Sequence, residues 1–312
     1  MFLNIAYINR VNIASLNGSE GTGGNLTAMK KISNYNGDEF AYISGQALRR
    51  YIKETLMQLD CKIASIGESG ESLVFLNNKK IDFKKFPSND KITKDINEAI
   101  FVNTDLDLFG FMIPIKGGQA YRRWSPIKVT PMISILPYKG EYDYLTRKAK
   151  KISENKIVQI EIDTLNFMRG NIIVNLKHIG SIVDEYNYDI TPILSEEERR
   201  KRVNVFIDSI KYLNGGAKQS RNLEDISPKF VIAIKQKTGN PFLLNALSVD
   251  KEGNIDIDII KDAISNSGID ESSISIGIAK GIFANEQLIR DSFSNVTSVS
   301  NALESLKENE SN

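Results

Sequence analysis

The sequence contains little of what metal sites and nucleophilic enzymes require. It has one cysteine, Cys61, and one histidine, His178, in 312 residues. A single cysteine cannot form an internal disulfide, and there is no Cys/His cluster for a structural zinc ion. His178 has no acidic residue at a spacing typical of a catalytic triad, and Cys61 lies in no recognisable motif. The sequence therefore does not indicate nucleophilic catalysis or a structural metal.

Long apolar runs and nucleotide-binding fingerprints are also missing. No apolar stretch approaches the ~18 residues typical of a membrane span, and the N-terminus lacks the features of a signal peptide. We therefore expect a soluble, cytoplasmic protein. The glycine-rich segment 18–24 lacks the lysine of a P-loop, and the GxGxxG motif is absent.

Charge is balanced over the whole chain but unevenly distributed along it. The sequence has 40 basic and 39 acidic residues. Residues 111–156 contain ten basic and three acidic side chains, whereas residues 241–312 contain five basic and twelve acidic ones. The basic segment favours a polyanionic partner, and the acidic segment favours a solvated or partner-facing surface. Chance clustering of surface charge is the alternative.

Hydrophobic periodicity predicts one α+β domain with insertions, and 41% hydrophobic content is enough for a sizeable core. Strands or β-like runs are predicted at residues 2–16, 99–113, 127–136, 157–163, 171–176, 229–235 and 273–278. Helices are predicted at residues 44–57, 196–214 and 255–265, with helical pieces in 284–306. Ser44 is the expected N-cap of the first helix, and Gly215–Gly216 the expected C-cap of the second.

Four segments rich in glycine, amides and basic residues are candidates for binding nucleic acid. They are residues 17–31, 44–50, 116–128 and 215–221. Phosphates bind cations and closely approaching backbone N–H groups, which glycine permits. The helix start at Ser44 adds N–H groups and the positive end of the helix dipole. Taken alone, each segment is more typical of a solvated turn.

Five short motifs occur together in an order that one protein family shares. They are Leu16-Asn-Gly with Gly23-Gly-Asn-Leu, Tyr42-Ile-Ser-Gly-Gln-Ala-Leu-Arg-Arg, Asp107-Leu-Phe-Gly, Ser125-Pro-Ile-Lys-Val-Thr-Pro and Gly215-Gly-Ala-Lys-Gln-Ser-Arg. Over residues 3–236 the chain resembles the guide-RNA-binding backbone subunit of type I CRISPR interference (Cascade) complexes. Its motifs are most similar to the DevR-type autoregulator branch found in subtype I-B.

The resemblance implies an architecture. The family has a palm of modified RNA-recognition (ferredoxin-like) fold, an inserted fingers region and a protruding β-hairpin thumb. It therefore implies a single palm domain over residues 1–312, with fingers at 62–98 and a thumb at 137–156. The sheet lacks the aromatic signature of ordinary RNA-recognition domains, so we do not expect bases to stack on it.

The resemblance also implies a function. Several copies would stack along one CRISPR RNA beside other Cascade subunits, and the protein would hold the RNA backbone while base pairing selects the target DNA. We expect no membrane partner and no cofactor. By position, the wedge of the thumb would be Tyr144, Leu145 and Thr146.

The RNA contacts come partly from the resemblance and partly from the four segments. Gln46, Arg49 and Lys218 match positions of the family's contacts to the RNA backbone, with Arg221 near them. The full set of RNA-binding candidates is Asn17, Lys30, Lys31, Ser44, Gln46, Arg49, Arg50, Arg122, Arg123, Lys218, Gln219 and Arg221.

Catalysis is not expected. Related backbone subunits of type III complexes cleave target RNA with an aspartate in the loop after the first strand, and residues 17–30 contain Glu20 but no aspartate. The alternative is a metal-dependent ribonuclease that uses Glu20 with Asp105 or Asp107, which alternate on one face of a predicted strand. Solvent-facing strand residues explain those two aspartates more simply. A small-molecule enzyme using the glycine-rich loop is a third, weaker interpretation.

Overall fold

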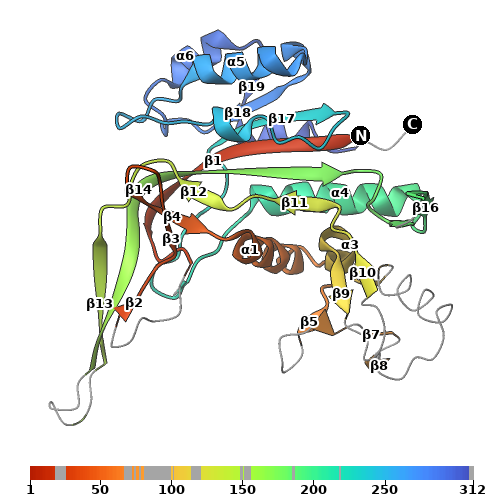
Figure 1. The fold of residues 1–312 in the computed structure, drawn as a ribbon, viewed down its shortest axis with the longest axis horizontal. Coiled ribbons are helices and arrows are strands. Elements are labelled where there is room, and N and C mark those ends of the chain that lie inside the picture. Colours follow the sequence, from red (N-terminus) through yellow and green to blue (C-terminus); the bar gives the residue numbers. More distant parts are fainter. Residues whose placement is uncertain are drawn as a thin grey trace.

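A large, mainly antiparallel sheet runs through the molecule and carries helices on both faces (Figure 1). The computed structural model describes residues 1–17, 26–66, 72–73, 75–76, 79–80, 100, 102–113, 121–147, 150, 156–184, 187–217 and 219–308. The expected α+β class is confirmed. The finer assignment of an RNA-recognition palm with fingers stays a prediction.

The centre of the sheet is a long antiparallel pair of strands. Across the sheet the order is β19 (Val296–Thr297), β18 (Ser275–Ile278), β17 (Phe230–Gln236), β1 (Phe2–Ala14), β14 (Lys156–Asn175), β12 (Met132–Ser134), β4 (Glu39–Ile43) and β3 (Lys31–Ser33). Three further strands pair with β14: β11 (Ile127–Val129), β13 (Glu141–Arg147) and β2 (Leu26–Thr27). β14 is one continuous strand where periodicity predicts two, because its middle pairs with β1 on one side.

Alternation along the central strands divides the core between the two faces of the sheet. Leu3, Ile5 and Tyr7 of β1 belong to one hydrophobic cluster, whereas Ala6 and Ile8 belong to the other. This is the period of two that the sequence shows, with both faces covered. The first cluster includes residues of α1 (Gly45–Gln58), α4 (Glu196–Lys211) and α7 (Val299–Glu304). The second includes residues of the short helix η3 (Leu244–Ala246), α5 (Ile257–Ser267) and α6 (Glu286–Ser292).

Both long helices under the first face begin at a serine. The Ser44 hydroxyl accepts a hydrogen bond from the Ala47 N–H at 3.2 Å, which confirms the predicted cap of α1. Ser195 caps α4 in the same way. The predicted glycine C-cap of α4 is wrong, because the helix ends at Lys211 with Tyr212 as its cap. Gly215 is instead required for close packing, because an added Cβ would lie 2.4 Å from the Tyr51 ring.

The β-like run predicted at residues 99–113 is wrong over most of its length. It contains α3 (Thr104–Phe109), followed by β9 (Phe111–Ile113), which pairs with β10 (Tyr121–Arg123). Two aspartates in the first turn favour a helix through its dipole. Gly110 ends the helix with φ +65, and a Cβ there would lie 2.2 Å from the Arg123 carbonyl oxygen.

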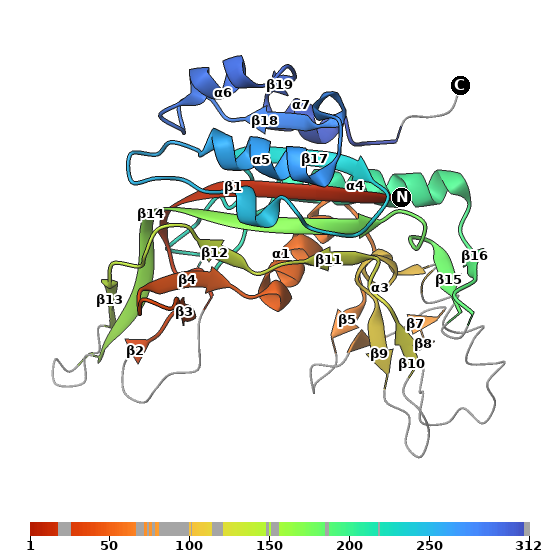
Figure 2. The same ribbon diagram turned by 45° about the horizontal axis from the view of Figure 1, so that its top comes forward.

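Two hairpins project from the same side of the sheet, on either side of α1 (Figure 2). One is formed by β13 and the first residues of β14, up to Ile162, so it overlaps the predicted thumb and extends beyond its predicted end at residue 156. The other is β9–β10. The remaining short elements are β5 (Ser65–Ile66), β6 (Ser72–Leu73), β7 (Phe75–Leu76), β8 (Lys79–Lys80), β15 (Ser181–Val183), β16 (Ile190–Pro192) and η4 (Glu271–Ser273). Most of the predicted fingers segment, including residues 81–98, lies outside the described residues.

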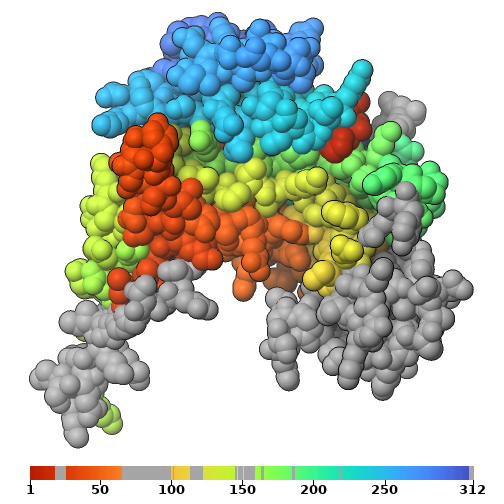
Figure 3. Space-filling view, viewed as in Figure 1, coloured from red at the N-terminus to blue at the C-terminus, as the bar shows by residue number. Residues whose placement is uncertain are grey.

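Figure 3 shows the surface of α1, in orange, between the two projecting regions. Within the acidic C-terminal part, α5 and α6 pack on the other face of the sheet, whereas α7 packs on the same face as α1. Within the parts of the chain that the structure describes, no helix is both long and apolar enough to cross a membrane.

Candidate nucleic-acid interface

A cavity of about 1200 Å³ lies where the four predicted segments meet, and we call it the α1 cavity. It is lined by Asn17, Lys30, Ser44, Gly45, Gln46, Ala47, Arg49, Arg50, Tyr51, Lys53, Glu54, Ser125, Ile127, Lys128, Val129, Gly216, Ala217 and Gln219. Each segment contributes residues to this lining, although the segments are far apart in the sequence. The structure therefore brings together elements that the sequence could link only by their composition.

The charge of the cavity lining is predominantly positive. Among the described residues that line it, Lys30, Arg49, Arg50, Lys53 and Lys128 are basic and Glu54 alone is acidic. The first turn of α1 lies in the same lining, so its N–H groups and the helix dipole reinforce the side-chain charge. Such a surface suits phosphate groups spaced along a strand.

Tyr51 holds the walls of the cavity together. Its hydroxyl donates a hydrogen bond to the Leu16 carbonyl oxygen at 2.9 Å, and Gly215 packs against its ring. The Ala217 N–H also donates to the Ser15 carbonyl oxygen at 2.7 Å. The loop after β1, helix α1 and the loop after α4 are thus mutually fixed. The sequence does not predict Tyr51 as a residue of the site, because its hydrogen bond to Leu16 joins segments that are far apart in the sequence.

The first turns of α1 present basic side chains in different ways. The Arg49 guanidinium lies 5.2 Å from the centre of the Phe109 ring and donates to the Phe109 carbonyl oxygen. Burial lowers the pKa of Arg49. Arg50 is exposed and pairs with Glu54 at 2.9 Å. Gln46 is exposed at the helix start. Arg49 is therefore positioned by packing, whereas Arg50 and Gln46 point to solvent.

Lys31, by contrast, is engaged inside the protein. Its ammonium group lies 3.0 Å from Glu161 and 3.4 Å from Glu39, and 4.8 Å from the centre of the Tyr138 ring. Although burial alone would lower the pKa of Lys31, its hydrogen bond to Glu161 and the two carboxylates raise it. The two carboxylates balance the positive charge of Lys31 within the protein, so Lys31 does not need an RNA phosphate as a partner.

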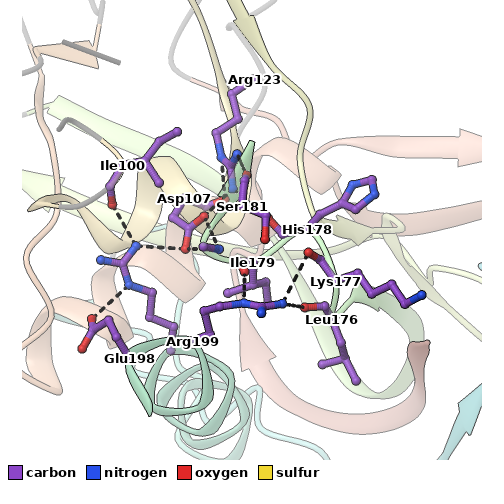
Figure 4. Close-up of polar contacts among 12 residues, drawn as sticks. Ile100, Asp107, Arg123, Leu176, Lys177, His178, Ile179, Ser181, Glu198 and Arg199 are labelled. Atoms are coloured by element: carbon purple, nitrogen blue, oxygen red, sulfur yellow. Dashed lines mark hydrogen bonds and ion pairs between the residues drawn. The ribbon is translucent and has the colours of Figure 1, made fainter. Parts of the chain in front are cut away.

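Arg123 belongs to a buried ionic group that we call the Asp107 network (Figure 4). Arg123 donates to both Asp107 and the carbonyl oxygens of Ser181 and His178. Arg202 donates to the other oxygen of Asp107 at 2.9 Å, and the Gly180 N–H also donates to this carboxylate. Burial lowers the pKa of Arg123, although Asp107 opposes that effect. The network joins α3, β10, α4 and the turn after β14.

The two aspartates of the ribonuclease alternative are placed differently from the sequence expectation. Asp105 and Asp107 lie on α3 and are almost fully buried. Asp105 pairs with Lys53 at 2.8 Å and accepts from the Ala64 N–H, so both carboxylates already have structural partners. Among the residues described, no group of three or more His, Cys, Asp or Glu side chains is arranged to hold a metal ion. Glu20 lies outside the described residues.

The remaining predicted residues are dispersed. Arg122 is exposed on β10, outside the α1 cavity, and Arg221, the last residue of the fourth segment, is exposed and does not line the cavity. Tyr144 is 62% exposed on β13, and Thr146 is also exposed. Lys218 and the side chain of Leu145 lie outside what the structure describes.

Comparisons with known proteins give a family from the sequence and a shared fold from solved structures. The family model described as "CRISPR-associated negative auto-regulator DevR/Csa2" matches residues 5–252. A chain of a solved "CRISPR RNA-guided surveillance complex, pre-nicking" is 12% identical, with a TM-score of 0.62, and the match covers 98% of this chain and 99% of that one.

A second solved chain, from a "CRISPR RNA-guided surveillance complex", is also 12% identical, with a TM-score of 0.53 and 98% of each chain covered. At this identity the structures establish a shared fold. No curated protein matches the chain in sequence. Because the family model spans most of the chain, this protein belongs to the CRISPR-associated negative auto-regulator DevR/Csa2 family.

Proposed function

We propose that this chain is a non-catalytic backbone subunit that binds guide RNA in a CRISPR interference complex of the subtype I-B kind. Family membership and the shared fold place it in the context of CRISPR-associated complexes. The observation that carries the proposal is the α1 cavity, because it gathers the four predicted segments around five basic side chains and a helix N-terminus.

The cavity suits a phosphate backbone better than a base sequence. Its polar groups are cations, backbone N–H groups and amides, which position a strand without reading its bases. Base pairing between guide and target DNA would then supply sequence specificity. Lys31 and Arg123 are left out of the proposed interface because their charges are neutralised within the protein.

RNA binding and its salt dependence test this function directly. We expect the purified full-length chain to bind single-stranded RNA of unrelated sequences with similar affinity. The logarithm of the binding constant should fall linearly with the logarithm of salt concentration, by about 0.7 for each phosphate contact. Copurified RNA, seen as a high ratio of absorbance at 260 and 280 nm, would agree. A protein that binds no RNA at low salt would refute the proposal.

The β13–β14 hairpin is proposed to be the thumb that joins neighbouring copies on the guide. It projects from the sheet, and Tyr142 and Tyr144 on it are exposed. We expect replacement of residues 139–155 by a short Gly-Ser turn to leave the monomer folded and to abolish growth in mass on longer guides. Light scattering with guides of increasing length measures this. Continued growth of the variant would show that the hairpin does not mediate assembly.

Absence of cleavage separates the proposal from the ribonuclease alternative. Since Asp105 and Asp107 are buried and paired, we expect no product from a labelled complementary RNA in the presence of Mg²⁺. Product that disappears in Glu20→Ala would instead support the metal-dependent ribonuclease.

A further inference from the structure

A second hollow adjoins the α1 cavity and differs from it in chemistry. It has a volume of about 390 Å³, within the range of roughly 300–1,000 Å³ for small-ligand sites. The two hollows share Arg49 and Ser125. The second is lined mainly by apolar and aromatic side chains, among them Phe109, Met112 and Trp124. A basic cavity thus continues directly into an aromatic one.

Trp124 dominates the exposed apolar surface of this hollow. Its side chain is 64% exposed, and that of the neighbouring Met112 is 67% exposed. Arg122, which also lines the hollow, is exposed and adds positive charge at its edge. An exposed aromatic beside an arginine is the combination that single-stranded nucleic acid binders use to hold unpaired bases.

The backbone at Trp124 is held firmly although the side chain faces solvent. On one side, the Arg123 guanidinium is anchored in the Asp107 network. On the other side, Ser125 donates a hydrogen bond to the Ile127 carbonyl oxygen at the start of β11. A Cβ on Gly110 would lie 3.1 Å from the Trp124 carbonyl carbon, so the C-terminal end of α3 packs closely against this segment. The ring is therefore presented from a fixed position, which lowers the entropy cost of binding.

We propose that an unpaired nucleobase of the RNA held in the α1 cavity enters this hollow and stacks on Trp124. The inference rests on the proposed RNA binding and adds a base contact to a site that otherwise takes phosphates. Arg49 and Ser125 lie at the junction, so a strand whose phosphates occupy the cavity can place an adjacent base beside Trp124. Stacking tolerates any base because each has a π face. The proposed contact lies on the segment between β10 and β11, so it does not require bases to stack on the sheet.

The only tryptophan of the chain provides a direct readout, since all indole emission comes from Trp124. We expect emission of the full-length protein to be quenched when single-stranded RNA binds, with binding followed independently by anisotropy of a label on the RNA. An abasic oligonucleotide of equal length should also bind but leave the emission unchanged. Equal quenching by both strands, or bound RNA without quenching, would overturn the stacking proposal while leaving RNA binding intact. Failure of both strands to bind would overturn both proposals.

Substitution gives a second, independent test. Trp124→Ala should weaken RNA binding by about tenfold, since loss of one stacked base costs on the order of 1–3 kcal/mol. Trp124→Phe should restore most of the affinity, and neither variant should change binding of the abasic strand. The matched control is Leu288→Ala, which removes another exposed apolar side chain from α6 on the opposite side of the sheet (Figure 1). Wild-type affinity of Trp124→Ala for ordinary RNA, or an equal loss in Leu288→Ala, would refute the assignment.

Discussion

The Asp107 network and the α1 cavity use the same kinds of side chain for opposite purposes. In the network, Arg123 and Arg202 are almost fully buried, and each donates to Asp107 and to backbone carbonyl oxygens. In the cavity, basic side chains line an open hollow. Lys53 pairs with the buried Asp105 and Arg50 with the half-buried Glu54, whereas Lys30 and Lys128 pair with no carboxylate among the described residues. Buried charges must be paired because desolvation is costly, whereas exposed ones remain available to an external anion. Partners and burial, not residue type, separate structural cations from candidate RNA contacts.

Two pairs of adjacent residues show this difference most clearly. Arg122 is exposed while Arg123 is anchored to Asp107. Lys30 lines the cavity while Lys31 pairs with Glu161. In each pair the alternation of a strand or its flank sends neighbouring side chains in different directions. Substitutions within these pairs, and at Asp107 itself, test whether buried cations stabilise the fold and exposed ones bind RNA.

The largest effect is expected at Asp107. Asp107→Asn should lower the free energy of unfolding by about 3–5 kcal/mol, because the buried Arg123 loses its counter-charge and the buried Arg202 keeps only Glu198. Urea unfolding followed by circular dichroism measures this. Glu54→Gln, which breaks the exposed pair with Arg50, is the control and should change stability by less than about 1 kcal/mol. Equal effects of the two substitutions would contradict the structural role of the network.

A smaller loss of stability is expected from Lys31→Gln. Glu161 is largely buried and also accepts from the Met29 N–H, so removal of the ammonium group leaves a carboxylate with too few partners. The expected cost is about 1–3 kcal/mol. The salt dependence of RNA binding should stay as in the wild type. A reduced salt dependence of RNA binding without loss of stability would instead show that Lys31 contacts RNA.

Lys30→Gln, at the neighbouring position, should instead weaken RNA binding and leave stability almost unchanged. Stability should change by no more than about 0.5 kcal/mol, as is usual for surface positions. The salt slope for single-stranded RNA should fall by about 0.7, the value for one lost phosphate contact. Lys251→Gln, in a C-terminal turn outside the cavity, is the matched control and should leave the slope unchanged. An equal fall of the salt slope in Lys30→Gln and Lys251→Gln would show that only net charge matters and that Lys30 makes no phosphate contact.

The smallest effect concerns pH. Burial, together with Arg123, Lys128 and the N-terminal ammonium group, lowers the pKa of His178 below its ordinary value of 6.5. The unfolded chain therefore binds a proton more readily, so the stabilising contribution is complete above about pH 6.5 and is lost as pH falls through the folded pKa. Unfolding measured at pH 7.5 and 5.5 should show this loss in the wild type and less of it in His178→Gln. Identical pH dependence would exclude His178 as the source.

Much of the fold follows from local patterns in the sequence. Alternation in β1 and the serine cap of α1 were predictable, because each is set by neighbouring residues. Residues 99–113 were not, since the apolar run there is too short to distinguish a buried helix from a strand. The end of α4 also differed, because Gly215 is needed for its packing against Tyr51 rather than for capping.

The candidate site was predictable in its segments but not in its individual contacts. Composition and motif order selected four segments, and all four contribute to the α1 cavity. No local pattern reveals that Lys31 faces Glu161, a residue more than a hundred positions away. The same holds for the long-range partners of Arg123. Such pairings depend on tertiary contacts, and they decide which cations remain accessible.

Strand β14 makes the projecting hairpin and the centre of the sheet parts of one mechanical unit. Its first residues pair with β13, and its later residues pair with β1 and β12. Leu165, within the part of β14 that pairs with β1, adopts φ +49, a conformation that is uncommon for a residue other than glycine. Because β14 runs without interruption from the hairpin into the sheet, the backbone of this strand sets the direction in which the hairpin projects. The pitch of any assembly built on that hairpin is thus encoded in the backbone of a single strand.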